Sequence, residues 1–203
     1  MASEYLTIEA PSQASMREKM SKFIAFAFPV ATASEARDCI ARVAADYHDA
    51  RHVCWAYMLG ADCAEFQWSD NGEPSGTAGK PILGQIRSLG LTNVAVAVVR
   101  YFGGIKLGTS GLIVAYRESA RMALEEAVHV TRFETADVQF TFPYVSMNSV
   151  MRVAKDPEVK MVGQQFDNTC SMTLRIRADR ADSLRGRLAD IDGVSFPEHP
   201  ESE

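Results

Sequence analysis

Apolar positions in the first two thirds of the chain predict four strands of a buried sheet. Residues 20–32 are rich in Phe and Ile, and residues 92–102 form a nearly continuous β-branched run, typical of a central strand covered on both faces. Residues 51–60 and 64–70 predict two neighbouring strands joined by a short connection. Alternation along the first of these predicts one face with His52, Cys54, Ala56 and Met58, and another with Val53, Trp55, Tyr57 and Leu59.

Helices are predicted between these strands, because apolar residues recur there every three or four positions. One helix covers residues 34–47, with Ser34 as its N-cap. A second begins near Pro81, which suits a first helical turn, and ends at Gly90. A third and longer helix covers residues 111–128.

The pattern restarts near Thr135. It predicts a strand, a helix, two strands, a helix and a short last strand, at residues 138–144, 146–156, 159–166, 170–178, 182–191 and 193–197. This β-α-β-β-α-β order is that of a ferredoxin-like domain. We therefore expect an α+β protein with two domains, residues 1–134 and residues 135–203.

Composition places the chain among soluble globular proteins. Hydrophobic residues make up 47% and charged residues 23% of its 203 residues, which is ordinary for such proteins. No apolar run reaches the length of a membrane span, and the opening segment MASEYLTIEAPSQ has neither the basic start nor the apolar core of a signal peptide. The four cysteines show no CxxC spacing. We therefore expect reduced thiols, no membrane partner and a cytoplasmic location.

Charge is distributed unevenly along the chain. Residues 62–79 carry four acids and no base, whereas residues 80–122 carry six bases and one acid. The net charge of −5 argues against a protein that coats nucleic acid indiscriminately. The basic segment is still compatible with one phosphate-facing surface. The alternative is that its charges point in different directions and are merely solvated.

Two glycine-rich loops of the same pattern open the second and third helices. Each contains a Gly-Thr-small-Gly tetrapeptide, Gly76-Thr77-Ala78-Gly79 and Gly108-Thr109-Ser110-Gly111. A helix start leaves backbone N–H groups without partners, and with the helix dipole these attract anions. Glycine lets a phosphate approach the backbone closely, and Lys80 and Lys106 add positive charge beside the loops. The alternative is that the glycines serve only turns and close helix–strand packing.

Named catalytic and metal-binding patterns are incomplete in this chain. Gly79-Lys80 is followed by Pro81, which excludes a P-loop. His52, Cys54 and Cys63 lack the ligand spacing of a zinc site. We expect no catalytic residue, no metal and no cofactor.

Four longer segments resemble the YigZ/IMPACT family: SKFIAFAFPV, HVCWAYML, SDNGEPSGTAGKPIL and NVAVAVVRYFGGIKLGTSGLIVAY. They lie within residues 20–122, and the remainder resembles the additional C-terminal domain of bacterial members. Two positions depart from the commoner spelling, with Asn71 where Asp is usual and Ser110 where Gly is usual. The loss of a charge at Asn71 weakens any metal site in the first loop, whereas Ser110 leaves an anion site intact.

The resemblance implies an N-terminal β-α-β domain, similar to ribosomal-protein domains and to domain IV of elongation factor G, followed by a ferredoxin-like domain. It also implies a link to translation, which eukaryotic relatives regulate through a protein partner. We therefore expect a non-catalytic, translation-associated protein that binds RNA or the ribosome through its basic loop surface. Two alternatives stay open: an enzyme acting on a small phosphorylated metabolite, and a protein-interaction module that regulates translation.

Site residues follow from the loops and from the resemblance. Those expected to bind phosphate or nucleic acid are Gly76, Thr77, Gly79, Lys80, Arg100, Tyr101, Gly103, Gly104, Lys106, Gly108, Thr109 and Gly111. Those expected to form a lid or a partner contact are Asp70, Asn71 and Glu73. In the enzyme alternative, Asp70 or Glu73 is the base and Lys106 holds the phosphate.

Overall fold

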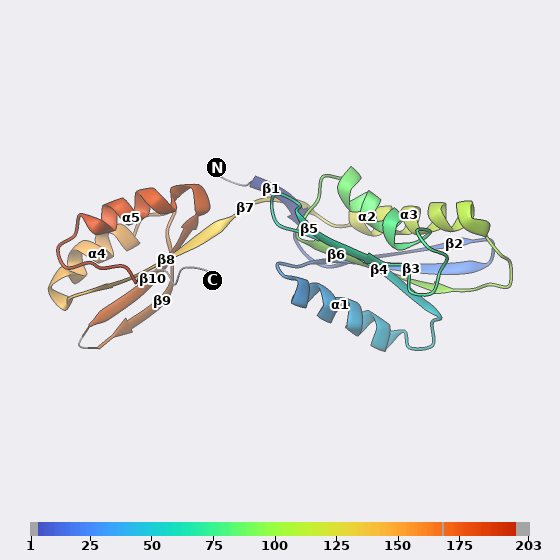
Figure 1. Ribbon diagram of the computed structural model, residues 1–203, viewed down its shortest axis with the longest axis horizontal. Helices are drawn as coiled ribbons and strands as arrows, with labels where there is room; N and C mark the ends of the chain where they lie inside the picture. The colour runs from blue at the N-terminus through green and yellow to red at the C-terminus, as the bar shows by residue number, and fades with distance from the viewer. Residues whose placement is uncertain (1–3, 168, 198–203) are drawn as a thin grey trace. The chain divides into compact units, whose positions relative to one another are not determined.

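The computed structural model describes residues 4–167 and 169–197. The chain divides into two units between Arg132 and Phe133 (Figure 1). Mixed helices and strands make up both units, in agreement with the predicted α+β class. Each unit is described here by itself.

The N-terminal unit is built on a five-stranded antiparallel sheet of order β2-β3-β6-β4-β5. These strands are β2 (Ser12–Glu18), β3 (Ser21–Pro29), β6 (Val94–Tyr101), β4 (His52–Leu59) and β5 (Glu65–Ser69). The four predicted strands are confirmed, and β6 is central, with every residue from Val94 to Arg100 buried. β2 was not predicted.

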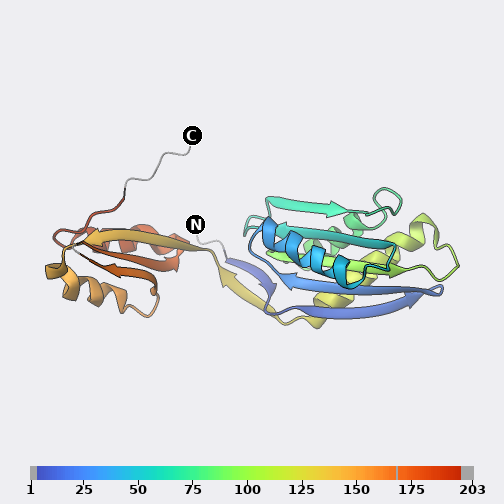
Figure 2. The same cartoon turned by 90° about the horizontal axis from the view of Figure 1, so that it is seen from below.

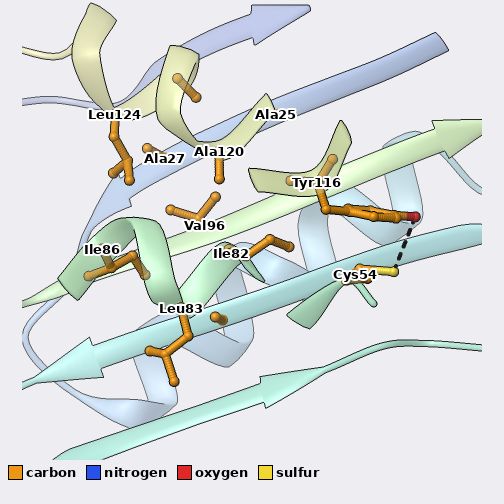
Figure 3. Close-up of a cluster of buried hydrophobic side chains, with 14 of the residues drawn as sticks. Ala25, Ala27, Cys54, Ile82, Leu83, Ile86, Val96, Tyr116, Ala120 and Leu124 are labelled. Atoms are coloured by element: carbon orange, nitrogen blue, oxygen red, sulfur yellow. Dashed lines mark hydrogen bonds between the residues drawn. The ribbon is translucent and has the colours of Figure 1, made fainter. Parts of the chain in front are cut away.

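Helices cover both faces of this sheet (Figures 1 and 2). α1 (Ala33–Asp46) packs on one face, and α2 (Gly79–Ser88) and α3 (Gly108–Glu126) pack together on the other. The predicted alternation of β4 is confirmed: the core under α2 and α3 contains Cys54, Ala56 and Met58, and the core under α1 contains Val53, Tyr57 and Leu59. Figure 3 shows the first of these cores, where Ile82, Ile86 and Leu124 surround Val96.

Two helix starts differ from the prediction. α1 begins after Thr32, not Ser34, because Thr32 has extended backbone and its hydroxyl accepts a hydrogen bond from the Glu35 amide at 3.2 Å. The Glu35 carboxylate in turn accepts from the Ala31 amide at 2.6 Å, so this is a reciprocal cap similar to a capping box. α3 begins at Gly108, so its glycine-rich tetrapeptide forms the first helical turn.

A short two-stranded sheet accompanies the larger one. It pairs β1 (Glu4–Ile8) with β7 (His129–Phe133), and neither strand was predicted. β1 is tied to the N-terminal unit by a hydrogen bond from the Thr92 amide to the Leu6 carbonyl at 2.9 Å.

The C-terminal unit has a three-stranded antiparallel sheet of order β8-β10-β9. Its elements are β8 (Thr135–Phe142), α4 (Met147–Ala154), β9 (Lys160–Phe166), β10 (Cys170–Arg177) and α5 (Ala181–Ala189), with short 3-10 turns at Tyr144–Ser146 and Ala178–Arg180. The predicted last strand is reduced to one antiparallel bridge between Ser195 and Thr141. One apolar cluster joins alternate residues of β8 and β10 to both helices.

Candidate anion-binding site

Both Gly-Thr-small-Gly tetrapeptides lie at helix starts on the same side of the five-stranded sheet. The first leads directly into α2, and the second forms the first turn of α3. The positions predicted for these loops are therefore confirmed. Their hydrogen bonding, however, is different.

The start of α2 is filled by a side chain of the protein itself. The Asp70 carboxylate accepts hydrogen bonds from three backbone amides, those of Gly76 at 2.8 Å, Ala78 at 3.0 Å and Gly79 at 2.8 Å. These are the donors that we expected to face a phosphate. Asp70 occupies the place of that anion and satisfies the positive end of the helix.

The glycines of the first loop serve packing and backbone geometry. Gly79 lies against β5, where an added Cβ would come within 2.8 Å of the Ser69 carbonyl oxygen. Gly76 has a φ of +76°, which side-chain-bearing residues rarely adopt. Thr77 is buried, and its hydroxyl donates to the Pro74 carbonyl at 2.6 Å.

A buried polar network lies beneath this loop. Arg100 Nη1 donates to Glu73 Oε1 at 2.6 Å, and the Tyr116 hydroxyl donates to the same oxygen at 2.8 Å. The side chains of Glu73 and Arg100 are only 4% and 7% exposed. The Cys54 sulfur lies 2.9 Å from the Asp70 carbonyl oxygen. It also lies 3.4 Å from the Tyr116 hydroxyl (Figure 3). Arg100 thus neutralises an acid of the chain.

Burial keeps two groups of this network protonated, the Cys54 thiol and the Tyr116 hydroxyl. It raises the pKa of the Cys54 thiol to about 12, with smaller raising effects from the charges of Glu73 and Asp70. Burial likewise raises the pKa of Tyr116 above its usual range. Both groups therefore stay protonated at neutral pH, and Tyr116 is a permanent donor to Glu73.

The residues expected to form a lid are turned inward. Asp70 and Glu73 hold α2 and Arg100, as described. The Asn71 side chain donates to the Val53 carbonyl at 3.1 Å, and the Asn71 backbone carbonyl oxygen lies 2.8 Å from His52 Nδ1. Because a carbonyl only accepts, Nδ1 of His52 is the donor in this bond.

At the start of α3, in contrast, no side chain among the described residues accepts from the backbone amides. This helix start lines a pocket of about 390 Å³ between the two loops. This surface, called here the basic pocket, is lined by Arg51, His52, Glu73, Pro74, Arg100, Phe102, Lys106, Leu107, Gly108, Thr109 and Leu112. Arg51 and Lys106 are exposed and form no ion pair with any described residue. Four of the predicted phosphate-binding residues therefore meet here: Arg100, Lys106, Gly108 and Thr109.

Other predicted residues lie outside the pocket lining. The Lys80 ammonium lies 5.7 Å from the centre of the Trp68 ring, and the Tyr101 hydroxyl donates to Asp49 at 2.6 Å. Gly103 packs against the backbone of Met20. The remaining residues outside the lining are Gly76, Thr77, Gly79, Gly104 and Gly111.

Arg51, His52 and Phe102 line the pocket but were not among the predicted site residues. Arg51 precedes β4, whose first residue is His52, and Phe102 follows β6. Because β4 and β6 are antiparallel neighbours with His52 opposite Arg100, the start of one strand lies beside the end of the other. That pairing brings together residues about fifty positions apart. The antiparallel register of these two strands was not predicted from the sequence. That pairing would have placed these residues beside one another.

Within the described residues, no helix is long and apolar enough to cross a membrane. The same part of the chain contains no group of three His, Cys, Asp or Glu side chains placed to hold a metal ion.

The fold and the pocket define an α+β domain with a basic pocket at the start of a long helix, followed by a second α+β unit. Residues 19–124 match the Impact N-terminal domain. A Haemophilus influenzae protein described as an IMPACT family member is 30% identical over 189 residues, which cover 92% of each chain. The chain belongs to the IMPACT family.

Two further similarities extend over most of the chain. The Escherichia coli IMPACT family member YigZ is 29% identical over 180 residues, or 88% of each chain. A crystal structure of a hypothetical protein is 29% identical, covers 92% of each chain and superposes with a TM-score of 0.75. Both units therefore have counterparts in related proteins.

Proposed function

We propose that this chain is a non-catalytic, translation-associated protein of the cytoplasm that binds RNA, including the RNA of the ribosome, through the basic pocket and its rim. The observation that carries the proposal is the pocket itself. There Arg51 and Lys106 lie beside the start of α3, and neither they nor the amides of that helix start have a side-chain partner among the described residues. A helix start with two free cations is suited to a phosphate group. The link to translation rests on the family resemblance.

The same resemblance supports the finer description of the fold. We propose that the N-terminal unit is similar to ribosomal-protein domains and to domain IV of elongation factor G. The C-terminal unit is proposed to be ferredoxin-like, with its fourth strand shortened to the bridge at Ser195. We expect this chain to contact the RNA backbone and to tolerate different sequences, because phosphate contacts position a protein without specifying bases.

The test is binding to ribosomes and to single-stranded RNA across a series of salt concentrations. The informative variant is Arg51→Ala with Lys106→Ala, because Arg100→Ala would leave the buried Glu73 without its partner. The matched control is Arg17→Ala with Arg37→Ala, which removes the same charge from exposed positions outside the pocket lining. Circular dichroism checks that all variants are folded.

Wild type and control are expected to bind with affinities that fall steeply as salt rises. The pocket variant should bind more weakly, and its slope of log K against log salt should be shallower by about 1.4, the value for two lost contacts on a single strand. Absence of binding at low salt, or equal slopes for both double variants, would overturn the proposal.

A second candidate function is an enzyme acting on a small phosphorylated metabolite. It is favoured by the position of the pocket between the two loops and by His52 and Glu73 in its lining. A metabolite screen that shows turnover lost in His52→Ala or Glu73→Gln, with phosphate binding retained, would favour this function over RNA binding.

A further inference from the structure

We propose that the basic pocket receives the phosphate monoester of a single nucleoside 5′-monophosphate, either as a free nucleotide or as the 5′ end of an RNA chain. This inference rests on the proposed function for the location of the site and adds the chemical class of the ligand. Three properties of the basic pocket support it: the charge of its lining, its hydrogen-bond donors and its volume.

The charges of the pocket match a dianion. Of the described residues that line it, Glu73 is the only acid, and Arg100 neutralises it at 2.6 Å. Arg51 and Lys106 remain, with a charge of about +2. A phosphate monoester carries between about −1.5 and −2 at neutral pH, whereas each internal phosphodiester of RNA carries a single negative charge. The pocket is therefore better neutralised by a terminal phosphate than by a bridging one.

The donors of the pocket are open to such a group. Gly108 has a φ of +75°, and a Cβ added there would meet nothing within 4 Å, so a ligand oxygen can approach the backbone. No described side chain accepts a hydrogen bond from the amides at the start of α3, in contrast to Asp70 at α2. Arg100 supplies a second and independent sign: its side chain is 93% buried, only Nη1 donates to a described residue, and Nε is buried without a partner. Because Nε has almost no accessible surface, the donors left for a phosphate are the N–H groups of Nη1 and Nη2 that Glu73 does not use.

Size and the exposed ring favour one nucleotide. A volume of about 390 Å³ lies at the lower end of small-molecule pockets, which begin at roughly 300 Å³. The Phe102 side chain lines the pocket and is 53% exposed, so its ring is accessible to a base. Aromatic stacking tolerates every base, because all bases have a π-face.

The experiment compares five ligands by calorimetry at low salt: adenosine 5′-monophosphate, adenosine, inorganic phosphate, and one RNA hexamer with either a 5′-phosphate or a 5′-hydroxyl. The phosphorylated hexamer is expected to bind at least about tenfold more tightly than the hydroxyl form, since its charge-assisted contacts are lost without the phosphate. Adenosine should show no binding at the same concentrations. The pocket variant Arg51→Ala with Lys106→Ala should lose the preference, and the control Arg17→Ala with Arg37→Ala should keep it.

The variant Phe102→Ala distinguishes the contribution of the base to binding from that of the phosphate. It should weaken binding of adenosine 5′-monophosphate several-fold and leave binding of inorganic phosphate unchanged. Tighter binding of the phosphorylated hexamer than of the mononucleotide identifies an RNA end as the source, and the reverse identifies a free nucleotide.

The outcomes also separate this inference from the proposed function. Equal binding of both hexamers, lost in the pocket variant, overturns the monoester and leaves RNA binding intact. Binding of the mononucleotide without either hexamer overturns RNA binding and supports the monoester. Absence of binding by the mononucleotide and by both hexamers overturns both.

Discussion

Asp70 shows how one side chain determines what a glycine-rich loop can do. Its carboxylate accepts from the amides of Gly76, Ala78 and Gly79 at the start of α2, and no side chain in the described part of the chain does the same at α3. The two tetrapeptides therefore have similar sequences and different roles. The first positions a helix against the sheet, and we propose that the second leaves its amides for a ligand.

Replacing Asp70 by Ala should destabilise the N-terminal unit by roughly 2 kcal/mol, because three amides lose a charged acceptor. Asp70→Asn keeps one acceptor oxygen and should cost less. Urea unfolding followed by circular dichroism measures both, and Asp38→Ala, at an exposed position of α1, is the matched control. A loss for Asp70→Ala no larger than for the control would contradict the capping role.

The buried pair of Glu73 and Arg100 gives a second prediction at this scale. Arg100→Met should destabilise the unit by about 3–5 kcal/mol, because it leaves a buried carboxylate without its partner. Adding Glu73→Gln removes that charge and should restore at least about 1 kcal/mol. Urea midpoints of the single and double variants decide this, and a double variant less stable than Arg100→Met would refute the account.

The positions of the two loops could be predicted from the sequence, whereas the side chains that contact the first loop could not. Helix starts and glycines are local signals, so the positions of both loops were predictable. The partners of Glu73 in the first loop are not local: Arg100 lies 27 residues from Glu73, and Tyr116 lies 43 residues from it. For this reason the pairing of Arg100 with Glu73 was not predicted, and Arg51 was not assigned at all.

Strands with a strong apolar face were predictable as elements, and weakly apolar strands were not. β3, β4 and β6 combine long apolar or β-branched runs with deep burial. β2 alternates between half-buried and exposed residues, and its inward positions hold the small or flexible Ser12, Ala14 and Met16. Its period-two signal is therefore faint, and tertiary pairing with β3 decides its structure.

The β8–β10 pair in the C-terminal unit gives a prediction about pH. Arg175 Nε and Nη2 donate to the two oxygens of Asp137, its register partner, at 2.7 and 2.8 Å. These bonds hold the pKa of Asp137 below its usual range. A lowered folded-state pKa contributes stability above the unfolded value, about 3.9, and this stability is lost as pH falls through the folded value.

Both side chains are more than two fifths exposed, so water screens the pair and the effect is small. Asp137→Asn should lower the urea midpoint slightly at pH 7, and the difference from wild type should disappear below the folded-state pKa. Asp190→Asn, at an exposed position just after α5, is the control. If the difference in urea midpoint between Asp137→Asn and wild type persisted or grew in acid, the predicted pH dependence would be wrong.

At the scale of the whole molecule, each of the two units has an apolar core of its own. Both clusters of the N-terminal unit draw on residues up to 127, and the cluster of the C-terminal unit begins at Val138. We expect a fragment of residues 1–134, which retains β7, to fold cooperatively on its own. Its circular dichroism spectrum and a single sharp urea transition would support this expectation, whereas a gradual, non-cooperative transition would contradict it.

The same fragment should keep the basic pocket, because all of its lining residues lie between Arg51 and Leu112. We therefore expect the fragment to bind RNA through the same residues as the full chain. Weaker binding by the fragment, with an unchanged effect of Lys106→Ala, would assign a further RNA contact to the C-terminal unit.

The central claim is that the two similar loops differ in one respect. The Asp70 carboxylate accepts hydrogen bonds from the amides at the start of α2, whereas the amides at the start of α3 are available to a ligand. The most direct measurement is an NMR titration of the ¹⁵N-labelled full chain with a 5′-phosphorylated RNA hexamer, following the backbone amides. The account predicts large shifts at Gly108 and Thr109, with little change at Ala78 and Gly79. Shifts at the start of α2 without shifts at the start of α3 would contradict it.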